Sequence, residues 1–275
     1  MQITPSAVCD AVKTIRQKSP LIHNITNYVV MNYTANALLA LGASPVMAHA
    51  EEEMEDMVNI SGALVINIGT LSDHWIKAMF RAANEAGKRN IPVILDPVGA
   101  GATKYRTRIT REFLETVPPT VIRGNASEIL AILQDDAKTK GVDSTVSSSA
   151  AIRDAHRINL TYGSVVCISG EVDYIISSDH LIKVMNGHQM MSMVTGMGCT
   201  ASALCGAFAA VNTSVTTAVS EAMSVMGMAG ELAVTSATGP GSLQYRFLDA
   251  LFTLSHEDIE RLLKIEVLSW KDYIS

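Results

Sequence analysis

Short apolar runs alternate with longer amphipathic segments along most of this 275-residue chain. The runs are rich in Val, Ile, Leu and Ala, and most end at a polar or glycine-containing turn. They occupy residues 21–25, 63–68, 91–95, 120–122 and 163–168, and residues 45–47 are also expected to be extended. Strands of this kind, separated by helices, predict an α/β fold: a mostly parallel central sheet covered by helices on both faces.

The segments between these runs repeat apolar residues with the helical period. Helices are expected at residues 5–17, 29–41, 51–57, 74–88, 110–115, 126–133, 150–157, 199–211, 215–235, 242–254 and 258–265. Asp73 is a candidate N-cap, residues 174–177 and 181–184 suggest a hairpin, and residues 135–149 suggest a loop. No repeat and no long linker is visible, so residues 1–275 are expected to form one domain.

Composition narrows the function classes. Hydrophobic residues make up 48% of the chain and charged residues 17%, which is typical of a globular protein with a large core. The net charge is −6 and basic residues are scattered, so we expect no nucleic-acid partner. The small share of charged residues also indicates some surface buried between subunits.

Location follows from what the sequence lacks. No apolar stretch approaches the ~20 residues that a membrane helix needs, and the first residues do not resemble a signal peptide. The four cysteines, Cys9, Cys167, Cys199 and Cys205, have neither zinc-site nor CxxC spacing. A cytoplasmic protein without a membrane segment is therefore expected.

The most informative stretch is VTGMGCTASALC, residues 194–205. Gly196 and Gly198 flank Met197, and a helix is expected to begin at Cys199. Glycines let the backbone approach a ligand closely, and a helix start presents unpaired N–H groups. Together these features predict an anion-binding turn.

Cys199 stands at the edge of this turn and allows three interpretations. A thiol at a helix N-terminus is expected to have a lowered pKa, which favours a nucleophilic thiolate, although no histidine is near in sequence to act as its base. It is alternatively a polar contact for a substrate hydroxyl, or a small buried residue of the core.

Charged residues follow the ends of two other predicted strands. Asp96 stands in DPVGAGAT directly after one strand, where a carboxylate can hold hydrated Mg²⁺ or simply form a turn. Arg123 follows the next strand and is either a partner for phosphate oxygens or an ordinary surface side chain. Asn125 and Glu128 form N-A-S-E, which is either a helix capping box or a pair at the mouth of a site.

Taken together, these motifs resemble the hydroxyethylthiazole kinase family of the ribokinase-like superfamily. N-A-S-E (residues 125–128) matches the N-x-x-E motif near Mg²⁺ in that superfamily, and G-M-G-C (residues 196–199) matches its G-T-G-D turn. Cys199 replaces the usual catalytic Asp, which is a mark of this family. Further matches are TANALLALGASPVM, LVINIGTL, LDPVGAGAT and GPGS, so the resemblance covers nearly the whole chain.

The resemblance implies a three-layer ribokinase-like sandwich and ATP-dependent phosphorylation of 4-methyl-5-(2-hydroxyethyl)thiazole with Mg²⁺. It further implies a homotrimer with thiazole sites between subunits. By position it assigns thiazole contacts to Asn27, Met47, Gly196 and Cys199, and ATP contacts to Arg123, Asn125 and Ser169. It assigns an anion hole to Gly196, Met197, Gly198 and Cys199, and the metal to Asp96 and Glu128. Cys199 is the expected catalytic residue, which positions the substrate first and accepts the hydroxyl proton second. Met197 departs from the Ala or Thr usual in the turn, and Ser169 stands where Thr is common.

Three other functions remain open on the sequence. A hydroxymethylpyrimidine kinase or an ATP-dependent dehydratase of damaged NAD(P)H would share the fold but typically keeps Asp at the position of Cys199. A non-catalytic trimer that binds thiazole or nucleotide would not need Asp96, Glu128 and the glycine turn intact. A thiol-dependent hydrolase with Cys199 as nucleophile would be recognised by a trapped acyl-enzyme.

Overall fold

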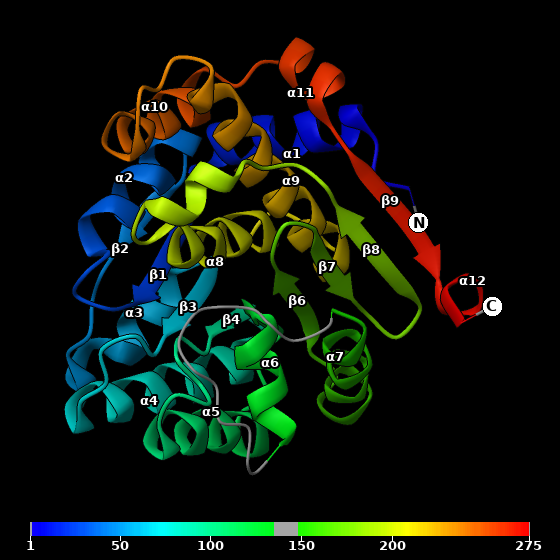
Figure 1. Ribbon diagram of the computed structural model, residues 1–275. Coiled ribbons are helices and arrows are strands. Elements are labelled where there is room, and N and C mark those ends of the chain that lie inside the picture. Colours follow the sequence, from blue (N-terminus) through cyan, green and yellow to red (C-terminus); the bar gives the residue numbers. More distant parts are fainter. Residues whose placement is uncertain (1, 135–147, 275) are drawn as a thin grey trace.

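A nine-stranded sheet runs through the middle of the molecule in the computed structural model, which describes residues 2–134 and 148–274 (Figure 1). Its strand order is β2-β1-β3-β4-β5-β6-β7-β8-β9. The parallel strands are β1 (Leu21–Ile25), β2 (Ser44–Val46), β3 (Ala63–Asn67), β4 (Val93–Asp96), β5 (Val121–Asn125) and β6 (Val165–Ser169). The mostly parallel sheet predicted from the apolar runs is therefore confirmed. Most of the loop predicted at 135–149 lies outside the described residues.

Three antiparallel strands complete the sheet: β7 (Asp173–Ile176), β8 (His180–Val184) and β9 (Ile265–Ser269). The predicted hairpin is confirmed as β7 and β8. The edge strand β9 was not predicted, because its residues follow a sequence that reads as the end of a helix. It pairs with β8, and the short helix α12 (Trp270–Ile274) follows it.

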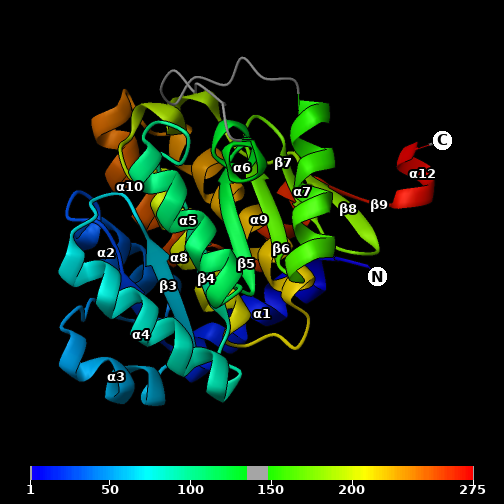
Figure 2. The same cartoon turned by 90° about the horizontal axis from the view of Figure 1, so that it is seen from below.

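Helices cover both faces of the sheet and form a three-layer sandwich, as Figures 1 and 2 show from two directions. One layer contains α1 (Pro5–Lys18), α2 (Met31–Leu41), α8 (Met197–Ala209), α9 (Val215–Val234), α10 (Pro240–Thr253) and α11 (His256–Leu262). The other contains α3 (Met54–Ile60), α4 (Asp73–Arg89), α5 (Lys104–Thr116), α6 (Ala126–Leu133) and α7 (Ser148–Tyr162). Two short 3-10 turns lie at Glu51–Glu53 and Gln189–Met193.

The sheet separates two hydrophobic cores. Ile22 of β1 packs into the core under α8, whereas Ile25 packs into the core under α4, because successive side chains of a strand point to opposite faces. Every residue of β3 is buried. Burial on both faces explains why the strands appear in the sequence as continuous apolar runs.

Three local predictions are corrected. Asp73 is the first residue of α4 and not its cap; the N-cap is Ser72, which makes no side-chain capping bond. Helix α5 begins at Lys104 and not at the predicted residue 110. The Thr103 hydroxyl accepts a hydrogen bond from the Arg106 amide and so caps the helix at this point. Arg123 belongs to strand β5 and not to a turn after it.

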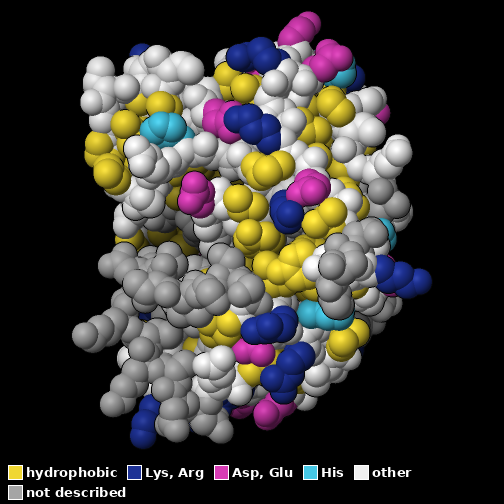
Figure 3. Space-filling model, turned by 45° about the vertical axis from the view of Figure 1, so that its right-hand side comes forward, with side chains coloured by type: hydrophobic (Ala, Val, Ile, Leu, Met, Phe, Trp, Pro, Cys, Tyr) yellow, Lys and Arg dark blue, Asp and Glu magenta, His cyan; other side chains and the backbone are white. Residues whose placement is uncertain are grey.

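The surface mixes side chains of all kinds. On the face in Figure 3, basic and acidic side chains are interspersed with apolar ones over the described residues. Within residues 2–134 and 148–274, no helix is long and apolar enough to cross a membrane.

Candidate active site

The carboxyl ends of the parallel strands form the edge at which the predicted functional residues meet. Register aligns these ends: Asn67 of β3 lies opposite Asp96 of β4, and Asn125 of β5 lies opposite Ser169 of β6. Open α/β sheets bind ligands at this edge. Residues far apart in the sequence are thus brought to one place.

A chain of buried hydrogen bonds links the loop after β1, the strands β3 and β4, and helix α8. Asn27 Nδ2 donates to Asn67 Oδ1 at 2.8 Å, and Asn67 Nδ2 donates to Asp96 Oδ2 at 2.8 Å. The Ser202 hydroxyl, on α8, donates to the same Asp96 oxygen at 2.8 Å. These donors fix the carboxyl group in one orientation.

Asp96 is only 1% exposed. Burial raises the pKa of its carboxyl group, while the positive charge of Arg123 and the hydrogen bonds from Ser202 and Asn67 lower it. A buried carboxyl group whose pKa is raised by desolvation and lowered by a specific charged partner is typical of functional sites.

Cys199 is placed at the predicted site, but its protonation differs from the prediction. Its sulfur lies 3.5 Å from Asn27 Nδ2. Burial and the nearby Asp96 carboxylate raise the pKa of the thiol to about 12. The expectation of a lowered pKa is therefore wrong, because desolvation and a like charge outweigh the helix N-terminus. This result disfavours the thiol-dependent hydrolase.

The glycine turn begins α8. Gly196 is its N-cap with φ of +87°, and a Cβ there would lie 2.8 Å from the Val30 side chain. The first helical hydrogen bond runs from the Thr200 amide to the Gly196 carbonyl. The amides of Met197, Gly198 and Cys199 precede it and have no acceptor within the helix, as an anion hole requires.

Met197 does not obstruct this turn. Its side chain is 6% exposed and packs in the core beneath α8. Its sulfur lies 4.0 Å from the Tyr33 hydroxyl, which donates to the Gln244 carbonyl on α10. Only the backbone of this residue is therefore available to a bound anion.

Arg123 is buried and not an ordinary surface side chain. It is 8% exposed, and its Nη2 donates to the Ser169 hydroxyl at 2.6 Å. A Cβ at Gly198 would lie 2.9 Å from Arg123 Nη1, so the turn packs directly against the guanidinium. The buried Arg123 Nε makes no hydrogen bond to a described residue.

Of the two roles that the sequence left open for Glu128, the structure confirms the capping box, and the role at the mouth of a site stays a prediction. Glu128 forms this capping box with Asn125: the Glu128 amide donates to Asn125 Oδ1, and Glu128 Oε2 accepts from the Asn125 amide, both at 2.9 Å. Its other oxygen, Oε1, accepts from the Gly99 amide at 2.9 Å. Burial, followed by the negative charge of Asp96, raises the pKa of the Glu128 carboxyl group.

The carboxyl groups of Asp96 and Glu128 suit a Mg²⁺ ion that also binds phosphate oxygens of a substrate. Among the described residues, no group of three or more His, Cys, Asp or Glu side chains could hold a metal without further ligands. Mg²⁺ typically takes one or two carboxylates and completes its shell with water and phosphate oxygens. Asp96 and Glu128 repel each other as anions, and a cation would relieve that repulsion.

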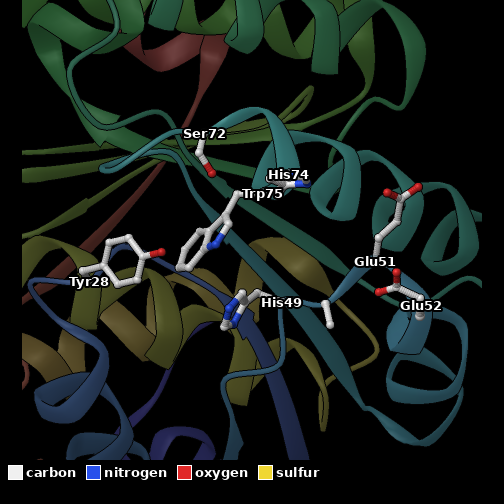
Figure 4. Close-up of a pocket in the computed structure, with 8 residues that line it drawn as sticks. Tyr28, His49, Glu51, Glu52, Ser72, His74 and Trp75 are labelled. Carbon is white, nitrogen blue, oxygen red and sulfur yellow. The ribbon is translucent and has the colours of Figure 1, made fainter.

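A surface pocket of about 380 Å³ is lined by Tyr28, His49 and Trp75, among others. In Figure 4 the rings of Tyr28, His49 and Trp75 lie side by side, and the ring centres of Tyr28 and His49 are each 4.8 Å from that of Trp75. Met47 follows β2 at the same edge of the sheet and is partly buried. No hydrogen bond between described residues links Met47 to the Asn27–Asp96 chain, so its role stays a prediction.

Sequence reasoning missed Asn67 and Ser202. Asn67 is a polar residue that ends the otherwise apolar run ALVIN, and that interruption was the available signal. Ser202 follows Cys199 by three positions, so both lie on one face of α8. Neither signal is specific unless one knows that both side chains donate to the same Asp96 oxygen.

Comparison with known proteins agrees with this geometry. The model of the hydroxyethylthiazole kinase family matches residues 12–257. The chain belongs to the hydroxyethylthiazole kinase family. Proteins named hydroxyethylthiazole kinase from Syntrophus aciditrophicus (strain SB) and Leptospira biflexa are 63% and 53% identical, over 96% and 92% of this chain and 98% and 94% of theirs.

Solved structures support the same family and the wider fold. The hydroxyethylthiazole kinase protein from Pyrococcus horikoshii OT3 has a TM-score of 0.88 and 41% identity, covering 96% of this chain and 99% of its own. Pyridoxal kinase from Staphylococcus aureus has a TM-score of 0.62 at 17% identity, covering 90% and 98%. The second likeness concerns the fold alone, and together they confirm the ribokinase-like class.

Proposed function

We propose that this chain transfers a phosphoryl group from ATP to the hydroxyl of 4-methyl-5-(2-hydroxyethyl)thiazole, in salvage of the thiazole half of thiamin. Its family membership supports this activity. The observation that carries it is the turn at Gly198, which rests on the buried Arg123 next to Asp96. A phosphoryl group at this turn would meet backbone N–H groups and a guanidinium, which stabilise the charge that develops during transfer.

The chain's own groups divide the work of the reaction. Arg123 and Ser169 hold phosphate oxygens, with Asn125 near the nucleotide, and the amides of residues 197–199 bind the transferring group. Asp96 and Glu128 would hold Mg²⁺, which would neutralise phosphate charge when bound. The thiazole hydroxyl oxygen attacks the γ-phosphorus, the bond from phosphorus to the ADP oxygen breaks, and the hydroxyl proton leaves to solvent or product phosphate.

Cys199 positions the substrate in this scheme. With a pKa of about 12, its thiol is protonated at neutral pH and cannot accept the hydroxyl proton. A neutral thiol beside Asn27 can contact the hydroxyl and hold it in line. A strong base is not required, because the transition state of phosphoryl transfer is loose.

We further propose a homotrimer in which thiazole sites lie between subunits. Tyr28 and Val29 directly follow Asn27 and are 65% and 66% exposed. Leu39, on the neighbouring α2, is 58% exposed. Large apolar side chains next to a substrate residue are typical of surface that a partner subunit covers. Covering them would enclose the thiazole contacts assigned to Asn27, Met47 and Gly196.

Two further predictions belong to the same proposal. A cytoplasmic location is supported by the four cysteines, which are all free thiols. A single kinase domain spanning residues 1–275 is supported by one continuous sheet that includes strands from both halves of the chain.

The decisive experiment incubates purified protein with Mg-ATP and a panel of thiazole and pyrimidine alcohols and measures ADP. We expect ADP formation that depends on hydroxyethylthiazole and is lost in Asp96→Asn. ADP formation with the pyrimidine alcohol alone would assign a different kinase. Binding of thiazole without any ADP would favour the non-catalytic alternative. Sedimentation of the same sample tests the trimer.

A further inference from the structure

Arg106 connects two loops of the site without lying in it. It is the third residue of α5 and is partly buried. Its Nη1 donates to the Val98 carbonyl at 2.6 Å, and its Nη2 donates to the Gly69 carbonyl at 2.7 Å. One guanidinium therefore ties the loop after β3 to the loop after β4.

The bond to Val98 reaches Glu128 through a single peptide group. The Val98 carbonyl and the Gly99 amide belong to the same peptide unit, and that amide donates to Glu128 Oε1 at 2.9 Å. A planar peptide transmits the constraint directly, because fixing its oxygen also fixes the direction of its N–H. A charged donor on the oxygen also polarises the N–H toward the carboxylate.

The local backbone is shaped around this contact. Gly99 has φ of +75°, and a Cβ there would lie 2.7 Å from Arg106 Nη1. The left-handed conformation favours glycine at this position, and the absence of a side chain lets the guanidinium pack directly against the backbone.

The bond to Gly69 reaches the thiazole side of the site. The Gly69 amide donates to Asn67 Oδ1, the same oxygen that accepts from Asn27. A Cβ at Gly69 would lie 2.6 Å from Asn27 Nδ2, so this loop packs directly on Asn27. Fixing the Gly69 carbonyl therefore limits the movement of Asn27.

We propose that Arg106 is a positioning residue for two groups of the site. It orients the Glu128 carboxylate through the Val98–Gly99 peptide, and it orients the Asn27 side chain through Gly69. It couples the metal side of the site to the thiazole side. The inference rests on the proposed roles of Glu128 and Asn27. Only a planar fork with two parallel donors can hold both carbonyls at once, so lysine cannot fully replace arginine here.

The test compares Arg106→Met and Arg106→Lys with the matched control Arg108→Met. Arg108 is two residues away on the same helix, is exposed, and contacts only Glu112 and the Tyr105 ring in the described structure. We measure the half-saturating Mg²⁺ concentration, KM for thiazole, kcat, and calorimetric binding of ADP with and without Mg²⁺, together with the melting temperature.

For Arg106→Met we expect about a tenfold rise in half-saturating Mg²⁺ and a rise in KM for thiazole. Loss of ADP affinity is expected only when Mg²⁺ is present. Arg106→Lys should recover part of each change, and Arg108→Met should match the wild type. A melting temperature that falls while these values stay at wild-type level assigns Arg106 a purely structural role and overturns the proposal.

Further variants cover two cases: Arg106→Met does not fold, or the proposed role of Glu128 is itself wrong. If Arg106→Met does not fold, Arg106→Lys decides, because wild-type Mg²⁺ and thiazole dependence in that variant contradicts the fork. Glu128→Gln is measured in parallel. If it leaves the Mg²⁺ requirement unchanged, the proposed role of Glu128 fails; if it raises the requirement while Arg106→Met does not, only the role of Arg106 fails.

Discussion

Two helices of this protein begin with the same local device and use it differently. Helix α6 begins with a capping box between Asn125 and Glu128, and α11 begins with one between Ser255 and Asp258. In each, the side chain of the first residue accepts from the amide of the fourth, whose carboxylate accepts in return. The backbone at the two helix starts is satisfied in the same way.

The surroundings of the two carboxylates are opposite. Asp258 is paired with the exposed Arg261 at 2.8 Å. Partial burial raises the pKa of Asp258, but the hydrogen bonds from Ser255 and Arg261 together outweigh it, so the pKa is lowered. Glu128 lies under the loop after β4 near Asp96, and burial raises its pKa. The comparison teaches that a capping motif specifies a helix start, whereas the electrostatic environment decides whether it also serves chemistry.

Among variants at the helix starts of α6, α8 and α11, the largest effect is expected from Glu128→Gln. One glutamine oxygen cannot accept from both the Gly99 and Asn125 amides, and the negative charge is lost. We expect activity at limiting Mg²⁺ to fall by about 10- to 100-fold, as measured by ADP release over a Mg²⁺ titration. An unchanged Mg²⁺ response would place Glu128 with Asp258 as a plain cap.

An intermediate effect is expected at a third helix start, that of α8. Cys199→Ala should reduce kcat by about tenfold, which corresponds to about 1.4 kcal/mol, and leave ADP binding intact. Full turnover would remove Cys199 from the catalytic machinery.

The protonation of Cys199 can be tested separately. Because burial raises the pKa of this thiol to about 12, the neutral form dominates up to pH 9. The rate at which iodoacetamide labels Cys199, followed by mass spectrometry, should therefore still be rising at pH 10. A plateau in labelling between pH 6 and 8 would show a thiolate and restore the helix-terminus expectation.

The smallest effect is expected from Asp258→Asn, the counterpart of Glu128→Gln. Ser255 remains as the N-cap in this variant, so only the negative charge near the helix N-terminus is lost. This loss should lower the free energy of unfolding by about 0.5 kcal/mol at pH 7 and leave kinase activity unchanged. The folded-state pKa of Asp258 lies below its unfolded value of 3.8, so its contribution is present above that pH. The difference from wild type, measured by urea unfolding, should shrink as the pH falls below 3.8. Reduced activity would break the comparison.

Much of the fold could be predicted because its signals are local. The bounds of β1 and α6 were predicted to the residue. The apolar run itself marks the ends of β1, and the capping box marks the start of α6. Strand β9 could not be predicted, because its partner β8 lies about 80 residues earlier and its own residues are only partly buried.

The sequence by itself determined the alternation of strands and helices, the glycine turn, and the presence of Asp96 and Asn125 at the strand ends. Tertiary structure alone decided that the Cys199 thiol is protonated, that Met197 points into the core, that Arg123 is buried under Gly198, and that Asn67 and Ser202 complete the setting of Asp96. The reason is physical: periodicity and caps are properties of neighbouring residues, whereas desolvation and charge depend on groups that meet only after the chain has folded.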